Sequence, residues 1–291
     1  MTVYEIITNR ILEKLEKGTL PWHKPWNGEA FIPKNLINKK NYRGINSLIL
    51  SLQDFNSPYW LTFNQANSLN GYVKSGERGT PVVFWKRLTV EQEDSSGEIT
   101  EKTIPLLRYY TVFNLMQCEN IKEDKIPTIE KRDIPPIKIC EEMIEGMPNK
   151  PEIRKHTGDR AYYSSKEDYI GLPLREQFKS PEEYYSTMFH ELIHSTGHEK
   201  RLNRPTLVDY SPFGTTNYSK EELIAEMGAC FLCGYAGIEN ITIDNSASYV
   251  ASWLKVLKDD TKLLIIASGA AQRAVDFILN KEENTDGFRE S

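Results

Sequence analysis

The segment from Met188 to His198 (MFHELIHSTGH) constrains this chain more than any other, because it contains the pattern His-Glu-x-x-His. An α-helix turns once in about 3.6 residues, so His190 and His194 would share one face and could each present a ring nitrogen to one metal ion. Glu191 would project about 100° away. There it could accept a proton from a water that the ion activates. The segment therefore predicts a helix that carries a metal-dependent hydrolytic site.

The residues before this pattern predict where the helix begins. Ser180 suits the N-cap, Pro181 suits the first helical position, and the two glutamates that follow suit the first turn. Gly197 favours a stop. We expect a helix over 181–194. Three of the five histidines of the chain lie between 190 and 198, so chance explains the spacing poorly.

Two histidines and a water leave a zinc site one protein ligand short. The metzincin pattern would place a further histidine at position 200, where this chain has Lys200. His198 comes two residues earlier, and in a continued helix it would stand roughly 12 Å from His190 along the axis. It could bind the same ion only if the chain turns at Gly197.

A better source of the third ligand lies downstream, in SKEELIAEMGA. Ser219 followed three residues later by Glu222 is a capping-box signature, which predicts a helix start, and Glu222 and Glu226 would share one face of that helix. Zincins of the gluzincin type take their third ligand from such a helix. By that resemblance, one of Glu222 and Glu226 binds the metal and the other orients a ligating histidine from behind. The sequence leaves their order open.

Charge divides the 291 residues unevenly. Residues 1–90 hold 12 Lys/Arg against 6 Asp/Glu, a net of +6, and the remaining residues hold 24 against 35, a net of −11. This asymmetry suggests that the front part meets a polyanion. The stretch LPWHKPW (20–26) places two tryptophans around a His-Lys pair, which suits stacking on bases beside phosphate contacts.

Cysteine usage and hydropathy exclude other classes. Four cysteines are too few for a disulfide framework in a chain of this length, and Cys230 and Cys233 form a C-x-x-C inside an apolar helical stretch, where we expect buried thiols. The N-terminus has no apolar signal core, and the most apolar run, Leu263–Ala271, is half the length of a membrane span. We expect a soluble, cytoplasmic protein without membrane contact.

Periodicity predicts the remaining elements. In the front part we expect helices over 3–15, 47–52 and from Thr62 to about 70, strands over 81–87 and 106–115, and a polar hairpin tip or disordered loop over 91–102. The charged, proline-containing residues 120–137 predict a linker. Beyond it we expect a helix over 139–145, short strands at 160–163 and 169–173, and helices over 248–257 and 261–279. Zincins place the edge strand that binds an extended substrate where 169–173 falls.

The order of these motifs resembles the ArdC-type antirestriction proteins of conjugative plasmids and other mobile elements. The resembling segments include ITNRILEKLEKGTLPWHKPW, NYRGINSLIL and YWLTFNQANSLNGYVKSGERGTPVVFWK in the front part, and HELIHSTGHEKRLNR and YSKEELIAEMGACFLCGYAGI in the rear. The departures are confined to the loop at 91–102, the linker and the tail. The resemblance implies an α+β protein of two domains: a small α+β single-stranded-DNA-binding (ssDNA-binding) domain over 1–119, the linker over 120–137, and a mostly helical zincin-like metallopeptidase domain with a short sheet over 138–291.

The resemblance also implies that the protein shields incoming mobile DNA from restriction. Candidate DNA contacts would form an aromatic platform in a basic groove, sensitive to salt: Trp22, Lys24, Trp26, Tyr42, Arg43, Asn46, Lys74, Arg78, Trp85 and Lys86.

Three functions are compatible with these motifs. The leading one is ssDNA binding combined with a gluzincin-type peptidase that acts on proteins near DNA, with Glu191 as the base and Tyr162, Tyr163 or His198 as candidate stabilisers of the oxyanion. The second is a DNA-binding protector whose metal site is structural or catalytically silent. A nuclease is less favoured, because phosphodiester-cleaving sites prefer carboxylate-rich, two-metal arrangements. Zn²⁺ is the expected cofactor, and Mn²⁺ or another divalent ion would also suit the ligands.

Overall fold

The computed structural model describes residues 1–18, 32–53, 55–93, 99–128, 135–208, 216–238, 240 and 247–281. Helices and strands are interspersed, which confirms the predicted α+β class. None of the helices in these ranges is long and apolar enough to cross a membrane. In chain order the elements are α1 (Val3–Glu16), β1 (Lys34–Asn35), α2 (Ile45–Ser51), β2 (Tyr59–Thr62), α3 (Phe63–Ser68), β3 (Tyr72–Val73), β4 (Thr80–Glu93), β5 (Ile99–Asn114), β6 (Cys118–Glu119), α4 (Pro136–Glu145), β7 (Glu152–His156), β8 (Tyr162–Ser164), β9 (Tyr169–Pro173), α5 (Pro181–Thr196), α6 (Pro205–Val208), α7 (Thr216–Ala236), α8 (Ala247–Asp259) and α9 (Leu263–Ile278).

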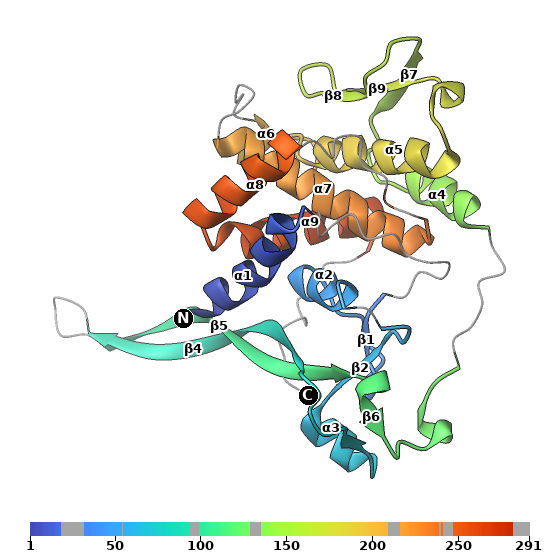
Figure 1. Cartoon of the computed structure of the whole chain (residues 1–291). Coiled ribbons are helices and arrows are strands. Elements are labelled where there is room, and N and C mark those ends of the chain that lie inside the picture. The colour runs from blue at the N-terminus through green and yellow to red at the C-terminus, as the bar shows by residue number, and fades with distance from the viewer. Residues whose placement is uncertain are drawn as a thin grey trace.

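The front part is built on a four-stranded sheet with the strand order β1-β2-β5-β4. β4 and β5 form a long antiparallel hairpin, from Thr80 opposite Val112 at its base to Glu93 opposite Ile99 at its outer end. Figure 1 shows this ribbon reaching away from the rest of the sheet. The predicted hairpin is therefore confirmed, but the bounds 91–102 given for its tip are too wide, because residues 91–93 and 99–102 belong to the strands. Ladder hydrogen bonds, which do not require apolar side chains, hold the outer ribbon together.

The rear part carries a three-stranded sheet, β7-β9-β8, which lies against α5 (Figure 1). The expectation that 169–173 is the edge strand is wrong. β9 is the central strand, parallel to β7 and antiparallel to β8. The chain passes directly from β8 back into β9 as a hairpin, so β8 takes the edge position. The local sequence predicts a strand here but does not determine its neighbours.

α7 packs against both α5 and α9 and forms the centre of the helical layer (Figure 1). The predicted start of this helix at Ser219 is wrong, because the helix begins at Thr216 and Ser219 lies inside it. The glutamate that was to close the capping box, Glu222, turns towards α5 instead.

One hydrophobic core joins the two parts of the chain. Its buried residues include Ile7 and Ile11 of α1, Ile49 of α2, and Leu264 and Val275 of α9. α1 lies beside α8, and α2 lies between β4 and α9 (Figure 1). The front part therefore buries apolar surface against the helices of the rear part.

Polar contacts cross the same boundary. The Thr8 hydroxyl donates to the carbonyl of Thr261 at 2.8 Å, and the Gly44 N–H donates to the side-chain oxygen of Gln272 at 2.9 Å. Gly44 has a φ of +53°, a conformation that favours glycine, and it leads directly into α2. Next to it, Arg43 forms an ion pair with Asp276 of α9.

The predicted linker packs in part against the front sheet. Ile121 and Ile126 contact a small core of Leu36, Tyr59, Leu61 and Ala66, while residues 129–134 lie outside the described part of the chain. The domain limits proposed from the sequence stay a prediction.

Candidate metal centre

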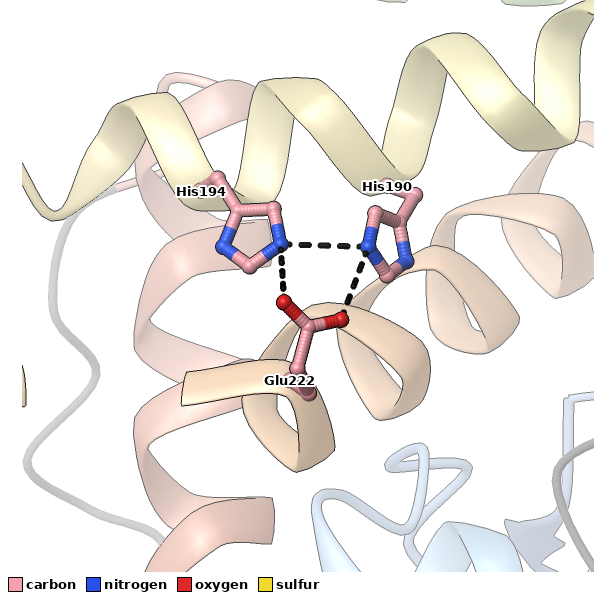
Figure 2. Close-up of side chains that lie close together, drawn as sticks. All are labelled: His190, His194 and Glu222. Atoms are coloured by element: carbon pink, nitrogen blue, oxygen red, sulfur yellow. Dashed lines mark hydrogen bonds and ion pairs between the residues drawn. The ribbon is translucent and has the colours of Figure 1, made fainter. Parts of the chain in front are cut away.

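α5 forms where the sequence predicts it and ends at Thr196, just before Gly197. The Ser180 hydroxyl accepts the N–H of Glu183 at 3.1 Å, which satisfies one of the unpaired donors of the first turn. His190 and His194 follow one turn apart on the face that meets α7 (Figure 2).

Three side chains converge between α5 and α7. The Nε2 atoms of His190 and His194 lie 3.1 Å apart. Each lies 3.5 Å from a different carboxylate oxygen of Glu222, His190 from Oε2 and His194 from Oε1. Figure 2 shows the two rings pointing from α5 onto this carboxylate. The three ligand atoms lie within 4.8 Å of one another.

These separations fit a divalent ion. A tetrahedral site with ligands about 2.0–2.1 Å from the metal holds neighbouring ligand atoms about 3.3–3.4 Å apart. The 3.1 Å between the two Nε2 atoms, and the 3.5 Å from each Nε2 to its partner oxygen on Glu222, are close to this value. Two imidazoles and one carboxylate are a donor set that leaves a fourth position for water or substrate.

The two glutamates whose order the sequence leaves open occupy different positions. Glu222 reaches the Nε2 atoms, whereas Glu226 lies on the opposite side of the His190 ring, 3.9 Å from its Nδ1. Glu222 therefore lies with the Nε2 atoms of the cluster, and Glu226 lies behind the His190 ring.

A third carboxylate, Glu221, lies behind His194, and sequence reasoning missed it. Its Oε1 is 3.3 Å from His194 Nδ1, and it forms an ion pair with Arg204. Burial alone would raise the pKa of Glu221, but hydrogen bonds from His194 and Arg204 outweigh this effect and lower it to about 2. Glu221 is adjacent in sequence to the predicted ligand Glu222, but the four-residue spacing that identifies Glu222 and Glu226 does not include it.

Glu191 lies beside the ligand cluster and is 7% exposed. Burial raises its pKa above the ordinary value, while the neighbouring histidines and a backbone hydrogen bond from Tyr163 act in the opposite direction. A buried carboxylate with a raised pKa is suited to accepting and returning a proton.

The three side chains suggested for the oxyanion have other partners. Tyr163 donates its hydroxyl to Asp168 at 2.8 Å, and the hydroxyls of Tyr162 and Tyr169 lie 3.0 Å apart on the exposed sheet. His198 Nδ1 accepts the N–H of Lys200 at 3.2 Å. Within the described residues, His198 is not part of the ligand cluster.

Tyr218 is the hydroxyl that the structure places at the cluster instead. It lies one turn before Glu222 on α7 and is hydrogen-bonded to that carboxylate, and burial is the largest cause of its raised pKa. Sequence reasoning missed it, because a helix start at Ser219 left Tyr218 outside the helix.

Cys230 and Cys233 are the buried thiols that the sequence predicts, and Cys140 is buried as well. All three thiols are free. Burial raises the pKa of Cys140 and of Cys230 to about 12 each, which leaves their thiols protonated and unreactive.

Four predicted DNA-contact residues lie inside the protein or have internal partners. Arg43 pairs with Asp276, and the Asn46 amide bonds both the N–H and the carbonyl of Val83 at 2.7 Å. Trp85 packs against the main core, and the partly buried Tyr42 packs against the Leu50, Trp60, Val82 and Val112 cluster.

Arg78 and Lys86 are exposed and Lys74 is partly exposed, so these three cations can reach a ligand. Trp22, Lys24 and Trp26 lie outside the described residues.

Two families match successive parts of the chain. The family described as the N-terminal domain of anti-restriction factor ArdC matches residues 1–113, and the family described as zincin-like metallopeptidase matches residues 141–271. The chain therefore has a two-domain architecture, with a zincin-like domain second.

The chain is similar to longer and to equally long proteins. It is 35% and 34% identical to two Escherichia coli proteins described as DNA primase TraC, over 96% of its own length in each case. It spans only 27% and 20% of those two relatives. It is 30% identical to the protein y4eC of Sinorhizobium fredii, covering 95% of this chain and 91% of that one.

Two solved structures have the same fold along the whole chain. The metal-free crystal structure of the antirestriction protein ArdC from plasmid R388 matches with a TM-score of 0.76 and 38% identity, and covers 100% of both chains. The Mn(II)-bound structure matches with a TM-score of 0.75 and 36% identity, and covers 98% of this chain and 100% of that one. The solved relative thus binds a divalent metal.

Proposed function

Because the chain belongs to the ArdC-type antirestriction proteins, we propose that it binds the single-stranded DNA of an incoming mobile element and carries a zinc-dependent peptidase site. The proposed peptidase site rests on the cluster of His190, His194 and Glu222, with Glu191 beside it. A purely structural metal site has no use for a buried, proton-accepting carboxylate next to its ligands.

Zn²⁺ suits two imidazoles and a carboxylate, and Mn²⁺, which the R388 relative holds, is the alternative occupant. When bound, such an ion polarises a substrate carbonyl and makes water a better nucleophile at neutral pH. The remaining chemistry belongs to the side chains. His190, His194 and Glu222 hold the ion. Glu191 takes the proton of the attacking water and passes it to the leaving amine.

We assign to Tyr218 the hydrogen bond that steadies the substrate carbonyl oxygen. Its hydroxyl already contacts Glu222 at the cluster, whereas Tyr162, Tyr163 and His198 are engaged elsewhere. The substrate class that fits the double function is a protein located on or near DNA.

One face of the β4–β5 hairpin has the character of a ssDNA platform. Alternate strand residues share a face, and paired residues lie opposite one another, so Phe84, Lys86, Arg108 and Tyr110 lie on one side. The rings of Phe84 and Tyr110 lie 5.7 Å apart and are partly buried, and Tyr110 packs against the same small core as Tyr42. Lys86 and Arg108 are exposed. On the opposite face, Val83 and Leu107 are buried in the core, while Tyr109 is exposed.

Rings beside exposed cations can stack bases while they contact phosphates. We therefore propose this face, with Arg78 and Lys74, as the DNA surface. Arg43, Asn46 and Trp85 are left out of this surface, because their side chains make contacts inside the protein.

Glu191→Gln separates the peptidase from a silent metal site. The substitution preserves shape and removes the proton acceptor, so we expect cells that carry the variant to lose protection of incoming DNA from restriction. Zinc content and ssDNA affinity, measured by fluorescence anisotropy of labelled oligonucleotides, should stay at the wild-type value.

Full protection by Glu191→Gln would favour the alternative, a DNA-binding protector whose metal site is silent.

The double variant Arg108→Ala with Lys86→Ala tests the proposed DNA surface on the β4–β5 hairpin. This double variant should weaken ssDNA binding and its salt dependence and leave zinc content unchanged. Undiminished ssDNA affinity would refute the assigned platform.

A further inference from the structure

Glu221 accepts hydrogen bonds from three different side chains. Arg204 Nε donates to its Oε2 at 3.2 Å, the other bond from the guanidinium goes to Oε1, and the Thr206 hydroxyl donates to Oε2 at 2.5 Å. The fourth contact is His194 Nδ1, 3.3 Å from Oε1. Glu221 is 4% exposed and Arg204 is 8% exposed, so water does not replace these partners.

This arrangement determines which nitrogen of His194 carries a proton. An ionised carboxylate only accepts, and its two oxygens offer about four acceptor positions. Guanidinium and hydroxyl donors already hold the carboxylate in this accepting role, so the imidazole must be the donor in the contact between Nδ1 and Oε1. Its Nε2 is then the atom with a free lone pair, and that atom faces His190 and Glu222.

Arg204 also fixes the end of the helix that carries both histidines. Its guanidinium donates to the carbonyl of Ile193 at 2.8 Å and to the hydroxyl of Thr196 at 2.5 Å. One buried side chain therefore ties the C-terminus of α5 to Glu221 on α7. The distance between the two helices is what sets the size of the ligand cluster.

We propose that Glu221, held by Arg204 and Thr206, is the positioning residue that presents His194 Nε2 to the metal. This inference rests on the proposed metal site. It assigns Glu221 to orient His194, whereas Glu226 lies behind His190. Only a carboxylate can serve here, because a glutamine has one acceptor oxygen and would direct its NH₂ at Arg204, Thr206 or His194.

Glu221→Gln tests the proposal, with Glu226→Gln as the matched control. Zinc affinity is measured by calorimetric titration, and the Nδ1–H protons of histidine are observed by NMR of zinc-loaded, ¹⁵N-histidine-labelled protein. Loss of a group that orients a ligating histidine lowers metal affinity about 10–100-fold. We expect this loss for Glu221→Gln, together with an upfield shift and faster exchange of the His194 Nδ1–H signal.

The control should leave the His194 signal unchanged and alter that of His190. Thr206→Val removes one donor to Glu221 without adding a buried charge, and it should weaken zinc binding in the same direction by a smaller factor. It decides the question if Glu221→Gln does not fold.

Wild-type zinc affinity and an unchanged His194 signal in Glu221→Gln, or in Thr206→Val if that variant alone folds, would overturn the proposal. Failure of the wild-type protein to bind zinc or Mn²⁺ would instead refute the metal site itself.

Discussion

Gly228 of α7 sets how closely α5 and α7, the two helices of the candidate metal centre, approach each other. A Cβ at this position would lie 2.6, 2.7 and 3.0 Å from three side-chain carbons of Ile193, which precedes His194 on α5. Ordinary contact begins at 3.4 Å, so Gly228→Ala requires a shift of up to 3.4 − 2.6 = 0.8 Å. Ile193 is fully buried and β-branched, with essentially one side-chain rotamer in a helix, so we expect the helices to separate.

Two opposing effects on stability accompany this shift. Alanine is favoured over glycine inside a helix by about 0.8–1 kcal/mol. Overpacking a well-packed core costs about 1–3 kcal/mol. The metal-free variant should therefore range from unchanged to about 2 kcal/mol less stable.

Metal affinity should respond much more strongly than stability. Each histidine Nε2 lies 3.5 Å from a different oxygen of Glu222, already slightly more than the about 3.3–3.4 Å between neighbouring ligand atoms around a tetrahedral ion. A further shift of up to 0.8 Å would stretch the site, so we expect zinc affinity to fall about tenfold or more. Calorimetric zinc titration and urea unfolding of the metal-free protein measure the two effects separately.

Gly269→Ala in α9 is the matched control, because its Cβ would meet only a guanidinium nitrogen of Arg273, at 3.9 Å. It should raise stability by about 0.5–1 kcal/mol and leave zinc affinity unchanged. If Gly228→Ala behaves in the same way, the close approach of the helices does not determine the geometry of the site.

Three further predictions test other contacts. Asn46→Ala should lower the free energy of unfolding by about 1–3 kcal/mol, because it leaves the N–H and carbonyl of Val83 on β4 without their side-chain partner. Urea unfolding measures this change, and a difference within experimental error would contradict the role of Asn46. Arg43→Gln should reduce stability through the loss of the Asp276 ion pair and leave ssDNA affinity within about twofold in anisotropy titrations, and a large fall in affinity would restore Arg43 as a DNA contact. Removing the metal with a chelator should lower the melting temperature and leave ssDNA binding unchanged. The lost stability should be about 2.7 kcal/mol if the metal concentration had been 100 times its Kd. A parallel loss of DNA affinity would show that the metal site and the DNA surface depend on each other.

Features that depend on neighbouring residues in the chain were predictable. The helix over Pro181–Thr196 follows from its cap and first turn, and the common face of His190 and His194 follows from helical geometry alone. The α+β class follows equally from the alternation of periodic segments.

Features set by packing between distant segments were not predictable. The rotation of α7 against α5 decides that Glu222 meets the histidine Nε2 atoms while Glu226 and Glu221 lie behind the rings. Composition likewise could not show that Arg43 and Trp85, in a basic and aromatic segment, have internal contacts. A charge or a ring has the same sequence signature on a surface and at an interface.

The packing of α1 against α8 also bears on how the molecule is made. The Thr8 hydroxyl and the Thr261 carbonyl that it bonds are 253 positions apart. At synthesis rates of about 5–20 residues per second, α1 leaves the ribosome about 10–50 seconds before its binding site exists. Until then its apolar face has no native cover, and contacts of such long sequence separation form slowly. The front part of the chain can therefore complete its folding only after the segment around Thr261 has emerged, so ribosomes stalled before residue 261 should carry a front part that is not yet fully folded.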